Sequence, residues 1–420
     1  MKRLTSSFVV TLLVISFIMG ISLATLGAEK KVVINSYMAD PAPKETLKQL
    51  VAEFEEANPD YAVTINTYPH EDYKTLIRTW LPSKKASPDI VTWFAGERAN
   101  TFVDKGLMMP LDDIWGEGKS FEDYFPRAFK SISQFEGETY FLPQSWYWWG
   151  FWYRKSVFNE LNLEEPITWN QFLDVCKELK ENDYTPITIG SKFRWTAAGW
   201  FDYLNLRVNG ADFHMKLMKG EVSYDSEKVR KVFEHWKELI DKGYFIENHS
   251  SYSWQEGAKF LFNKEAGMYL MGQFIQDVVS DEKIKEDLGF FRFPIIDASV
   301  PIAEETPTDG YMIPKNAPHP EAAKKFMHFL ATRDAQWFFA KKLNRIAANK
   351  NIEPENYDPM VQKGLQMINR SDKVTQFYDR DTKPAMADKA MDQFVKFMAK
   401  PGQIDQILRS LEAERKKVFE

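Results

Sequence analysis

The sequence is poor in cysteine: its 420 residues include only Cys176, so an internal disulfide cannot form. Cys176 lies in FLDVCKELK, where Phe172, Val175 and Leu179 repeat at helical spacing. This pattern predicts a packed side chain rather than a nucleophile. No cysteine follows the apolar N-terminal run either, so the sequence offers no thiol there for a lipid.

An excess of charge of one sign is also missing. Lysine and arginine number 54, against 60 aspartate and glutamate residues. Binding a polyanion requires a dense basic surface, because many phosphates must be neutralised at once. We therefore expect no nucleic-acid partner.

Recognisable catalytic and metal-binding motifs are absent from the sequence. The phosphate-loop pattern fails at 118–120, because Asp113 stands where a glycine is required. The calcium-loop pattern fails at 379–384, where lysine and proline replace a ligand and the turn glycine. The six histidines form no HExxH motif and no short metal-spaced pair. We expect no catalytic residue, no metal site and no cofactor, although two distant carboxylates of a secreted glycoside hydrolase or lyase would escape such a search.

The first residues have the composition of an export signal. Lys2 and Arg3 precede an apolar run over residues 8–19, and small residues follow up to position 28. This predicts a signal peptide over residues 1–28 that is cleaved to leave a periplasmic chain without a lipid anchor. A retained anchor is the alternative, since residues 8–26 are long enough to span a bilayer at ~1.5 Å per residue.

The rest of the chain alternates short β-branched runs with amphipathic segments. Strands are predicted, in order, over residues 31–38, 61–68, 88–94, 186–191, 265–274 and 288–295. Helical patterns separate them, and the chain from Pro320 to Glu420 is mostly helical. Alternating strands and helices predict an α/β fold with parallel strands, whose carboxyl ends present loops that can bind ligands.

A chain of this length is too long for one core, and its 44% apolar content is enough for two lobes. No flexible Gly/Ser linker separates them, so we expect ordered crossings near 143–155, 267–275 and 305–312 that together form a hinge. The predicted division assigns 29–145 plus 274–308 to an N-terminal lobe and 146–273 plus 309–420 to a C-terminal lobe.

Aromatic side chains make up 15% of the chain, and they crowd the stretch QSWYWWGFWYR at 144–154. In an extended segment neighbours point to opposite sides, so one face would carry Trp146 and Trp148 and the other Tyr147 and Trp149. We expect one face to enter a core and the other to line a cleft. Electron-rich rings suit the C–H faces of sugars, which favours a carbohydrate site.

Several segments occur in an order that is typical of one protein family. They are KVVINSYM at 31–38, PDIVTWFAGE at 88–97, the aromatic stretch followed by EEPITWNQFLDVCKELK, KEAGMYLMGQF at 264–274 and DGYMIPKNAPHPEAAKKFMHFLA at 309–331. In this order the chain resembles the extracellular solute-binding proteins (family 1) of ABC sugar importers, the group that includes maltose-binding protein. The resemblance implies the periplasmic binding protein fold (type II), with two α/β lobes, a multi-segment hinge and a ligand cleft between the lobes.

The resemblance also implies which residues bind the ligand. In the first lobe and the hinge they are Tyr37, Asp40, Trp93, Glu97, Trp146 and Trp148. The second lobe supplies Lys192, Trp195, Trp200, Asp202, Trp254 and Gln255, and the later crossings and the loop beyond them supply Gln273, Asp309, Tyr311 and Arg345. Other roles remain open: Asp40 can simply cap a helix, and Trp195 and Trp200 lie on different sides of a helix, so that only one can face the cleft.

By this resemblance we expect a monomeric periplasmic receptor that binds a sugar, either an oligosaccharide or a small glycoside, and delivers it to a membrane ABC permease. Such a receptor makes and breaks no bond. The remaining possibility is a receptor for a peptide or an anionic metabolite, in which Lys192, Arg194 and Arg345 would clamp a carboxylate or a phosphate.

Overall fold

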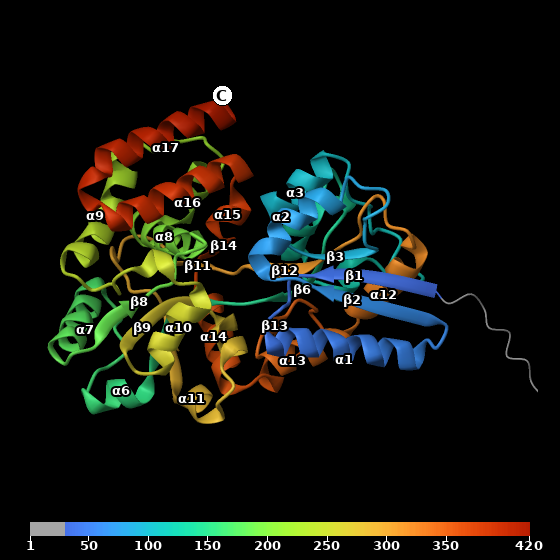
Figure 1. Ribbon diagram of the computed structural model, residues 1–420, viewed down its shortest axis with the longest axis horizontal. Helices are drawn as coiled ribbons and strands as arrows, with labels where there is room; N and C mark the ends of the chain where they lie inside the picture. The colour runs from blue at the N-terminus through green and yellow to red at the C-terminus, as the bar shows by residue number, and fades with distance from the viewer. Residues whose placement is uncertain (1–29) are drawn as a thin grey trace, which may run out of the picture.

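Residues 30–420, described by a computed structural model, form two α/β lobes, each with its own sheet and hydrophobic core (Figure 1). The predicted two-lobed α/β fold is confirmed. The expected signal peptide at residues 1–28 lies outside the described residues. Within the described part of the chain, no helix combines the length and the apolar composition that a bilayer crossing needs.

The first lobe is built on a six-stranded sheet with the strand order β13-β6-β12-β3-β1-β2. Its strands are β1 (Lys30–Ser36), β2 (Tyr61–Thr67), β3 (Ile90–Phe94), β6 (Leu142–Trp146), β12 (Thr308–Met312) and β13 (Ile346–Ala347), while β4 (Gln134–Phe135) and β5 (Glu138–Thr139) pair separately. Strands β1, β2 and β3 are parallel, whereas β12 runs antiparallel to both β3 and β6. The three parallel strands are those that the β-branched runs predicted.

Helices cover both faces of this sheet. They are α1 (Pro41–Ala57), α2 (His70–Trp80), α3 (Glu97–Asp104), α4 (Phe121–Tyr124), α5 (Lys130–Ser133), α12 (Pro320–Ala331) and α13 (Arg333–Leu343), with a 3₁₀ turn η1 (Arg127–Phe129). In α1, Leu47, Leu50 and Phe54 recur at helical spacing and are buried. Because this stripe faces the sheet, Phe54 reaches Phe326 of α12, with 4.9 Å between the ring centres.

The second lobe contains a four-stranded sheet with the order β10-β7-β9-β8. Its strands are β7 (Trp149–Arg154), β8 (Thr185–Thr188), β9 (Ala266–Gly272) and β10 (Leu288–Phe291), and β11 (Ala303–Glu305) pairs separately with β14 (Lys373–Thr375). Its helices are α6 (Lys155–Glu160), α7 (Trp169–Glu181), α8 (Trp195–Met218), α9 (Glu227–Asp241), α10 (Trp254–Phe262), α11 (Glu282–Asp287), α14 (Pro359–Asn369), α15 (Tyr378–Asp381), α16 (Pro384–Ala399) and α17 (Ile404–Phe419). Short 3₁₀ turns are η2 (His249–Ser251), η3 (Gln273–Val278), η4 (Pro354–Asn356) and η5 (Pro401–Gln403).

Local sequence signals explain helix α7. Its predicted cap, Thr168, accepts a hydrogen bond from the backbone N–H of Gln171, and the Gln171 side chain accepts one from the Thr168 N–H at 3.0 Å. Cys176 is fully buried on this helix, so its predicted packing role is confirmed. Burial also raises the pKa of the thiol, which disfavours the reactive thiolate.

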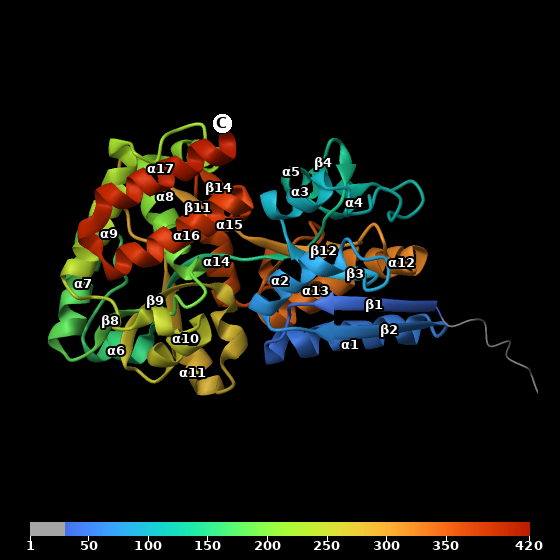
Figure 2. The ribbon, with the colours of Figure 1, turned by 45° about the horizontal axis from the view of Figure 1, so that its top comes forward.

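Among residues 30–420 the chain passes between the two sheets three times, as Figures 1 and 2 show. The passages from β6 to β7 and from β11 to β12 match the crossings predicted near 143–155 and 305–312. The third runs from β13 to α14. The crossing predicted near 267–275 is wrong, because β9 leads through η3 to β10 of the same sheet, although η3 packs against α1 and α13 of the first lobe.

The predicted division of the chain is corrected at two places. Strand β10 pairs with β7, so part of the range 274–308 lies in the second lobe rather than the first. Conversely, β12, α12 and α13 belong to the first lobe, although the prediction placed 309–420 wholly in the second. Both strands are short and fully buried, and the local sequence of such a strand does not determine which sheet it joins.

The lobes also touch away from the crossings, where α15 lies beside α3. Arg98 of α3 forms an ion pair with Asp379 of α15 at 2.7 Å and donates a second hydrogen bond to the Asp379 backbone oxygen. Gly96, with φ of 89°, allows this approach, since a Cβ there would lie 2.6 Å from the Arg380 backbone oxygen. The structure is therefore one in which the lobes meet around the space between them.

Candidate ligand-binding cleft

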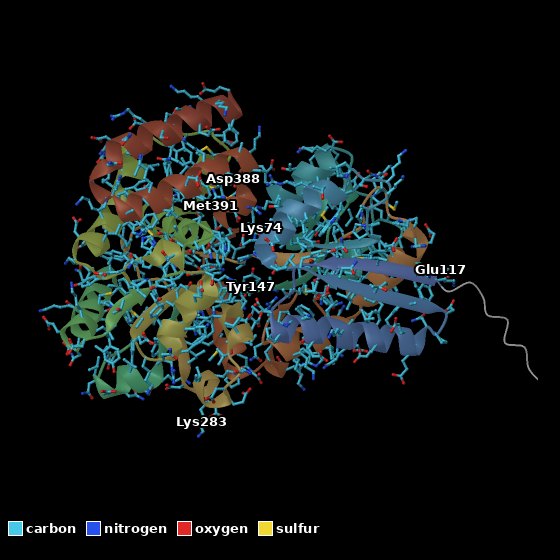
Figure 3. The ribbon with its side chains drawn as sticks, in the orientation of Figure 1. Lys74, Glu117, Tyr147, Lys283, Asp388 and Met391 are labelled. Atoms are coloured by element: carbon cyan, nitrogen blue, oxygen red, sulfur yellow. The ribbon has the colours of Figure 1, made fainter. Side chains whose placement is uncertain are left out.

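A cleft opens between the lobes where the crossings meet. Figure 3 labels two of its lining residues, Lys74 of α2 and Tyr147 of the first crossing, between the two lobes. The first lobe and the crossings contribute Tyr37, Met38, Asp40, Pro43, His70, Lys74, Phe94, Tyr147, Pro307, Asp309 and Arg345. The second lobe contributes Trp149, Trp195, Trp254, Phe274, Asp277, Phe377, Asp379 and Arg380.

Aromatic rings form the second-lobe wall of the cleft. Trp149, at the start of β7, packs at 4.7 Å from Phe377 and edge-on to Trp195 at 6.0 Å between ring centres. Phe274 lies 5.2 Å from Trp254, again edge-on. These side chains come from five separate segments, so the wall exists only once the lobe has folded.

The first-lobe wall combines two rings with polar groups. Tyr37, which follows β1, stacks on Phe94 at the end of β3, with 4.9 Å between ring centres. Burial raises the pKa of the Tyr37 hydroxyl well above its usual value, so this group stays protonated. Within residues 30–420 that hydroxyl is buried without a hydrogen-bond partner.

Arg380 joins both lobes at the base of the cleft. Its guanidinium donates to Asp309 Oδ1 at 3.0 Å and to the Thr308 backbone oxygen at 3.1 Å, both on β12. A further bond goes to the Tyr147 hydroxyl at 3.1 Å, and the guanidinium lies 4.5 Å from the centre of the Phe94 ring. This arrangement ties α15 to the first lobe and fixes the positions of Asp309 and Tyr147.

A second buried ion pair joins Arg345 to Asp277. Burial raises the pKa of the Asp277 carboxyl to about 6, and the Arg345 charge only partly offsets that rise. The Arg345 guanidinium also lies over the Tyr147 ring, 5.7 Å from its centre. Both arginines of the cleft therefore reach it already paired with a carboxylate.

Helix α2 brings two further polar groups to the cleft, His70 and Lys74. Glu71 between them accepts hydrogen bonds from Lys74 at 3.1 Å and contacts His70 Nδ1 at 3.0 Å. Although burial alone would raise it, the Lys74 and His70 interactions lower the pKa of Glu71 to about 2. The Lys74 charge is thus neutralised within its own helix.

Six of the residues expected from the sequence line the cleft. They are Tyr37, Asp40, Trp195, Trp254, Asp309 and Arg345. Asp40 also stands at the N-cap of α1, but its side chain makes no capping hydrogen bond there. Trp195 begins α8 and faces the cleft while Trp200 does not, as the helical spacing required.

Six of the expected residues lie outside the cleft because they are buried within a lobe. They are Trp93, Trp148, Trp200, Asp202, Gln273 and Tyr311. Trp93 packs on Phe102 and Trp148 on Phe290, which places each ring in the core of its own lobe. Gln273 instead holds the backbone, donating to the Leu343 oxygen at 2.8 Å.

The other four expected residues outside the cleft are partly or fully exposed. Trp146 is half-buried, donates from Nε1 to the Ala347 backbone oxygen at 3.0 Å and so secures β6 to β13. Lys192 points to solvent, and Glu97 and Gln255 are half-exposed near the starts of α3 and α10. Loop and helix-start residues near a cleft need not enter it, because one residue of offset redirects a side chain.

The predicted alternation along the aromatic stretch has its phase reversed. Tyr147 and Trp149 line the cleft, whereas the family resemblance implied Trp146 and Trp148. Both sets of rings are large and apolar, so hydrophobicity alone cannot tell which set faces a core. The cleft residues His70, Phe274 and Phe377 were also missed, since each reaches the cleft through tertiary packing and no motif in its own segment marks it as a binding residue.

Comparisons with known proteins identify the family. The model of the bacterial extracellular solute-binding proteins matches residues 39–337. An uncharacterized ABC transporter extracellular-binding protein of Pyrococcus horikoshii is 29% identical over 323 residues, which cover 75% of this chain and 72% of the relative. The multiple sugar-binding protein of Streptococcus mutans is 22% identical over 345 residues, with 81% and 80% covered.

A solved structure agrees with this assignment. It is that of the bacterial solute receptor AcbH, which is described as having an exclusive preference for β-D-galactopyranose. The two chains are 32% identical with a TM-score of 0.88, and the match covers 93% of this chain and all of AcbH. With a family model over most of its length and a receptor of the same fold at this identity, the chain belongs to the bacterial extracellular solute-binding proteins, which are receptors and not enzymes.

Proposed function

We propose that this protein is the sugar receptor of an ABC importer, which closes its lobes around a neutral sugar and passes the sugar to a membrane permease. The observation that carries the proposal is the composition of the cleft, in which aromatic rings face polar side chains across the gap between the lobes. Rings can stack on the C–H faces of a sugar, while carboxylates, amide groups and cations pair with its hydroxyls.

The pairing of charges in the cleft supports a neutral ligand. Arg345 and Arg380 are held by Asp277 and Asp309, and Lys74 by Glu71. An anionic ligand would have to compete with these carboxylates for each cation. The alternative anion clamp is weakened further, because Lys192 is exposed outside the cleft and Arg194 pairs with Asp392 at 2.7 Å.

Similar proteins support a carbohydrate ligand. The Streptococcus mutans relative is named for binding multiple sugars, and AcbH, at 32% identity, is described as binding β-D-galactopyranose. A glycoside hydrolase is not favoured, since the family consists of solute receptors. An unpaired buried hydroxyl costs about 1 to 3 kcal/mol, so the polar wall would choose among sugars by the positions of their hydroxyls.

Closure of the lobes would couple binding to delivery. Ligand contacts from both walls favour the closed state because the open state offers only part of them. The site is proposed to lie in a periplasmic chain that has lost its signal, carries no lipid anchor and acts as a monomer. The extracellular character of the family supports this location, and the lack of a cysteine at residues 20–28 supports a chain without a lipid.

Calorimetry with a panel of ligands tests the proposal. The panel would contain neutral mono- and oligosaccharides, the corresponding uronic acids and short peptides. We expect a neutral sugar to bind with a dissociation constant near micromolar, about −8 kcal/mol, and the uronic acid of the same sugar to bind far more weakly. Tight binding of a peptide or a uronic acid, with no neutral sugar bound, would refute the proposal.

A further inference from the structure

Behind the cleft, three side chains of the second lobe converge on one buried point. They are Asp202 and His214, both on α8, and Glu305 at the end of β11, and all three are fully buried. One ligand atom from each lies within 4.8 Å of the other two. His214 Nε2 is 3.8 Å from Asp202 Oδ1.

A kink in α8 creates this convergence. Asp202 and His214 are twelve positions apart, which in a straight helix would separate them by about 18 Å along the axis. At Gly210 the backbone leaves the helical conformation, with φ of 78° and ψ of 167°. The second half of α8 therefore turns back, and Asn205 comes within 3.0 Å of His214 Nδ1.

The converging atoms lack other partners. Throughout residues 30–420, no group outside the cluster forms a hydrogen bond to Asp202 Oδ1, His214 Nε2 or either carboxylate oxygen of Glu305, although a proton held between Asp202 and Glu305 would join these two carboxyls. Such groups cost free energy when buried, and a buried carboxylate costs more than a neutral group. The neighbouring Glu304 differs, because its Oε1 pairs with Arg207 at 2.7 Å and with Arg292 at 2.9 Å, so its charge is compensated even though its Oε2 has no hydrogen-bond partner.

The charged groups that act most strongly on Asp202 and Glu305 are acidic. The two carboxyls of the cluster act on each other, and Asp379, Asp381 and Glu304 lie near enough to add further negative charge. A divalent cation would neutralise two carboxylates and leave the site with no net charge.

We propose that Asp202, His214 and Glu305 hold a divalent first-row transition metal ion such as Zn²⁺. One imidazole nitrogen and carboxylate oxygens suit such ions, which bind these atoms at ~2.0–2.2 Å. Glu305 can offer both oxygens, giving up to four donor atoms with Asp202 Oδ1 and His214 Nε2. Calcium fits poorly, since it takes six to eight oxygen ligands.

Ligation would also set the tautomer of His214. With Nε2 on the metal, the proton lies on Nδ1 and is donated to the Asn205 side-chain oxygen, which requires the Asn205 amide to be turned with its oxygen toward the ring. Asn209, which now donates to Asn205 at 2.8 Å and lies nearer the surface, would turn with it.

The ion would brace the wall of the cleft. The second oxygen of Asp202 accepts the Tyr378 N–H at 2.9 Å, at the start of α15, which carries Asp379 and Arg380 into the cleft. Glu305 ends β11 and leads directly into the crossing to Asp309. Metal binding should therefore stabilise the fold whatever ligand the cleft takes, and its test does not depend on the proposed sugar.

The test begins with tag-free wild-type protein, unfolded in a chelator and refolded with Zn²⁺, with Ca²⁺ or without metal. We expect one Zn²⁺ per chain by elemental analysis after gel filtration, a higher melting temperature with Zn²⁺ only, and visible absorption of a low-symmetry site when Co²⁺ replaces Zn²⁺. Refolded protein with native circular dichroism but no bound metal would overturn the proposal.

Variants locate the ion. His214→Gln should lose Zn²⁺ binding by a hundred-fold or more, whereas His235→Gln, on the same lobe but outside the cluster, should bind Zn²⁺ as the wild type does. Equal Zn²⁺ binding by His214→Gln would overturn the assignment. If the wild type binds no metal and Asp202→Asn is more stable at neutral pH, the two carboxyls share a proton instead, which also refutes the metal site.

Discussion

Two neighbouring tryptophans of the first crossing have different surroundings. Trp148 is fully buried and packs against Phe290, while a Cβ on Gly364 would lie 2.4 Å from its ring. Trp149 is only 2% exposed, yet it packs against Phe377 and lines the cleft. Exposure does not separate the two rings, because a closed cleft hides its own walls. What separates them is whether the neighbouring surface belongs to a core or to the gap between the lobes.

The largest effect is expected at the core ring. Trp148→Ala should lower the free energy of unfolding by about 3 to 5 kcal/mol, the usual cost of removing a large buried ring. Denaturant unfolding measures this change, and Trp148→Phe should lose less. A loss below about 1 kcal/mol, together with weaker sugar binding, would show that the two rings have been assigned the wrong way round.

Next in size is the effect of the cleft ring on binding. Trp149→Ala should weaken the affinity for the sugar by ten-fold or more, at about 1.4 kcal/mol per ten-fold, because it removes a stacking surface. Calorimetry at a temperature where the variant is fully folded measures the change. Lys192→Ala serves as the control and should keep wild-type affinity, since Lys192 is exposed outside the cleft. Unchanged affinity in Trp149→Ala would leave the cleft without its proposed stacking wall.

Two milder substitutions on α8 test whether a cleft ring and a core ring again differ in their effects on affinity and stability. Trp195→Phe should reduce sugar affinity by a few-fold with little loss of stability, because Trp195 lines the cleft. Trp200→Phe should cost about 1 to 2 kcal/mol of unfolding free energy and leave affinity unchanged, since Trp200 packs against Phe245 and Phe293. Equal loss of affinity in both variants would contradict the assignment of helix faces.

The last prediction concerns how stability depends on pH at α15, the helix that follows Phe377 behind Trp149. Burial raises the pKa of Asp381 from 3.8 to about 7. Between these two pH values the folded state keeps the Asp381 proton, whereas the unfolded state releases it. The protonated carboxyl therefore contributes its full share of the free energy of unfolding below pH ~4, and this contribution is lost as the pH rises through about 7. Thermal unfolding should therefore show stability falling over this window.

Asp381→Asn removes that titration while its side-chain oxygen can still accept the Gln376 N–H, now bound at 3.0 Å. The slope of stability against pH should flatten between pH 4 and 7 in this variant. A slope equal to that of the wild type would assign the pH dependence to other groups, with Asp277 the next candidate because its pKa is about 6.

Much of the fold could be predicted because its signals are local. The predicted strands became β1, β2, β3, β8, β9 and β10, and Thr168 capped α7 as its spacing indicated. The pairing of strands from distant segments was harder to predict from the sequence. The strand at 288–291 and the strand at 308–312 exchanged lobes relative to the prediction, since each is short and its local sequence does not determine which sheet it joins.

In the cleft, too, some residues could be predicted from the sequence and their distant partners could not. Asp309 and Arg345 were predicted and line the cleft, but their partners Arg380 and Asp277 were not, because an ion pair between positions about 70 residues apart has no sequence spacing to reveal it. The buried cluster of Asp202, His214 and Glu305 is even harder to predict from the sequence. It depends on the turn at Gly210, and no motif search could have joined those residues.

By itself, the sequence determined that this chain folds as two α/β lobes and that aromatic rings gather at the first crossing, since periodicity and composition act over a few residues. Only the tertiary structure decided which rings face the gap and which charges meet across it. The physical reason is that alternation places side chains on two faces of a strand without determining which face lies in a core. That choice depends on which part of the folded protein packs against each face.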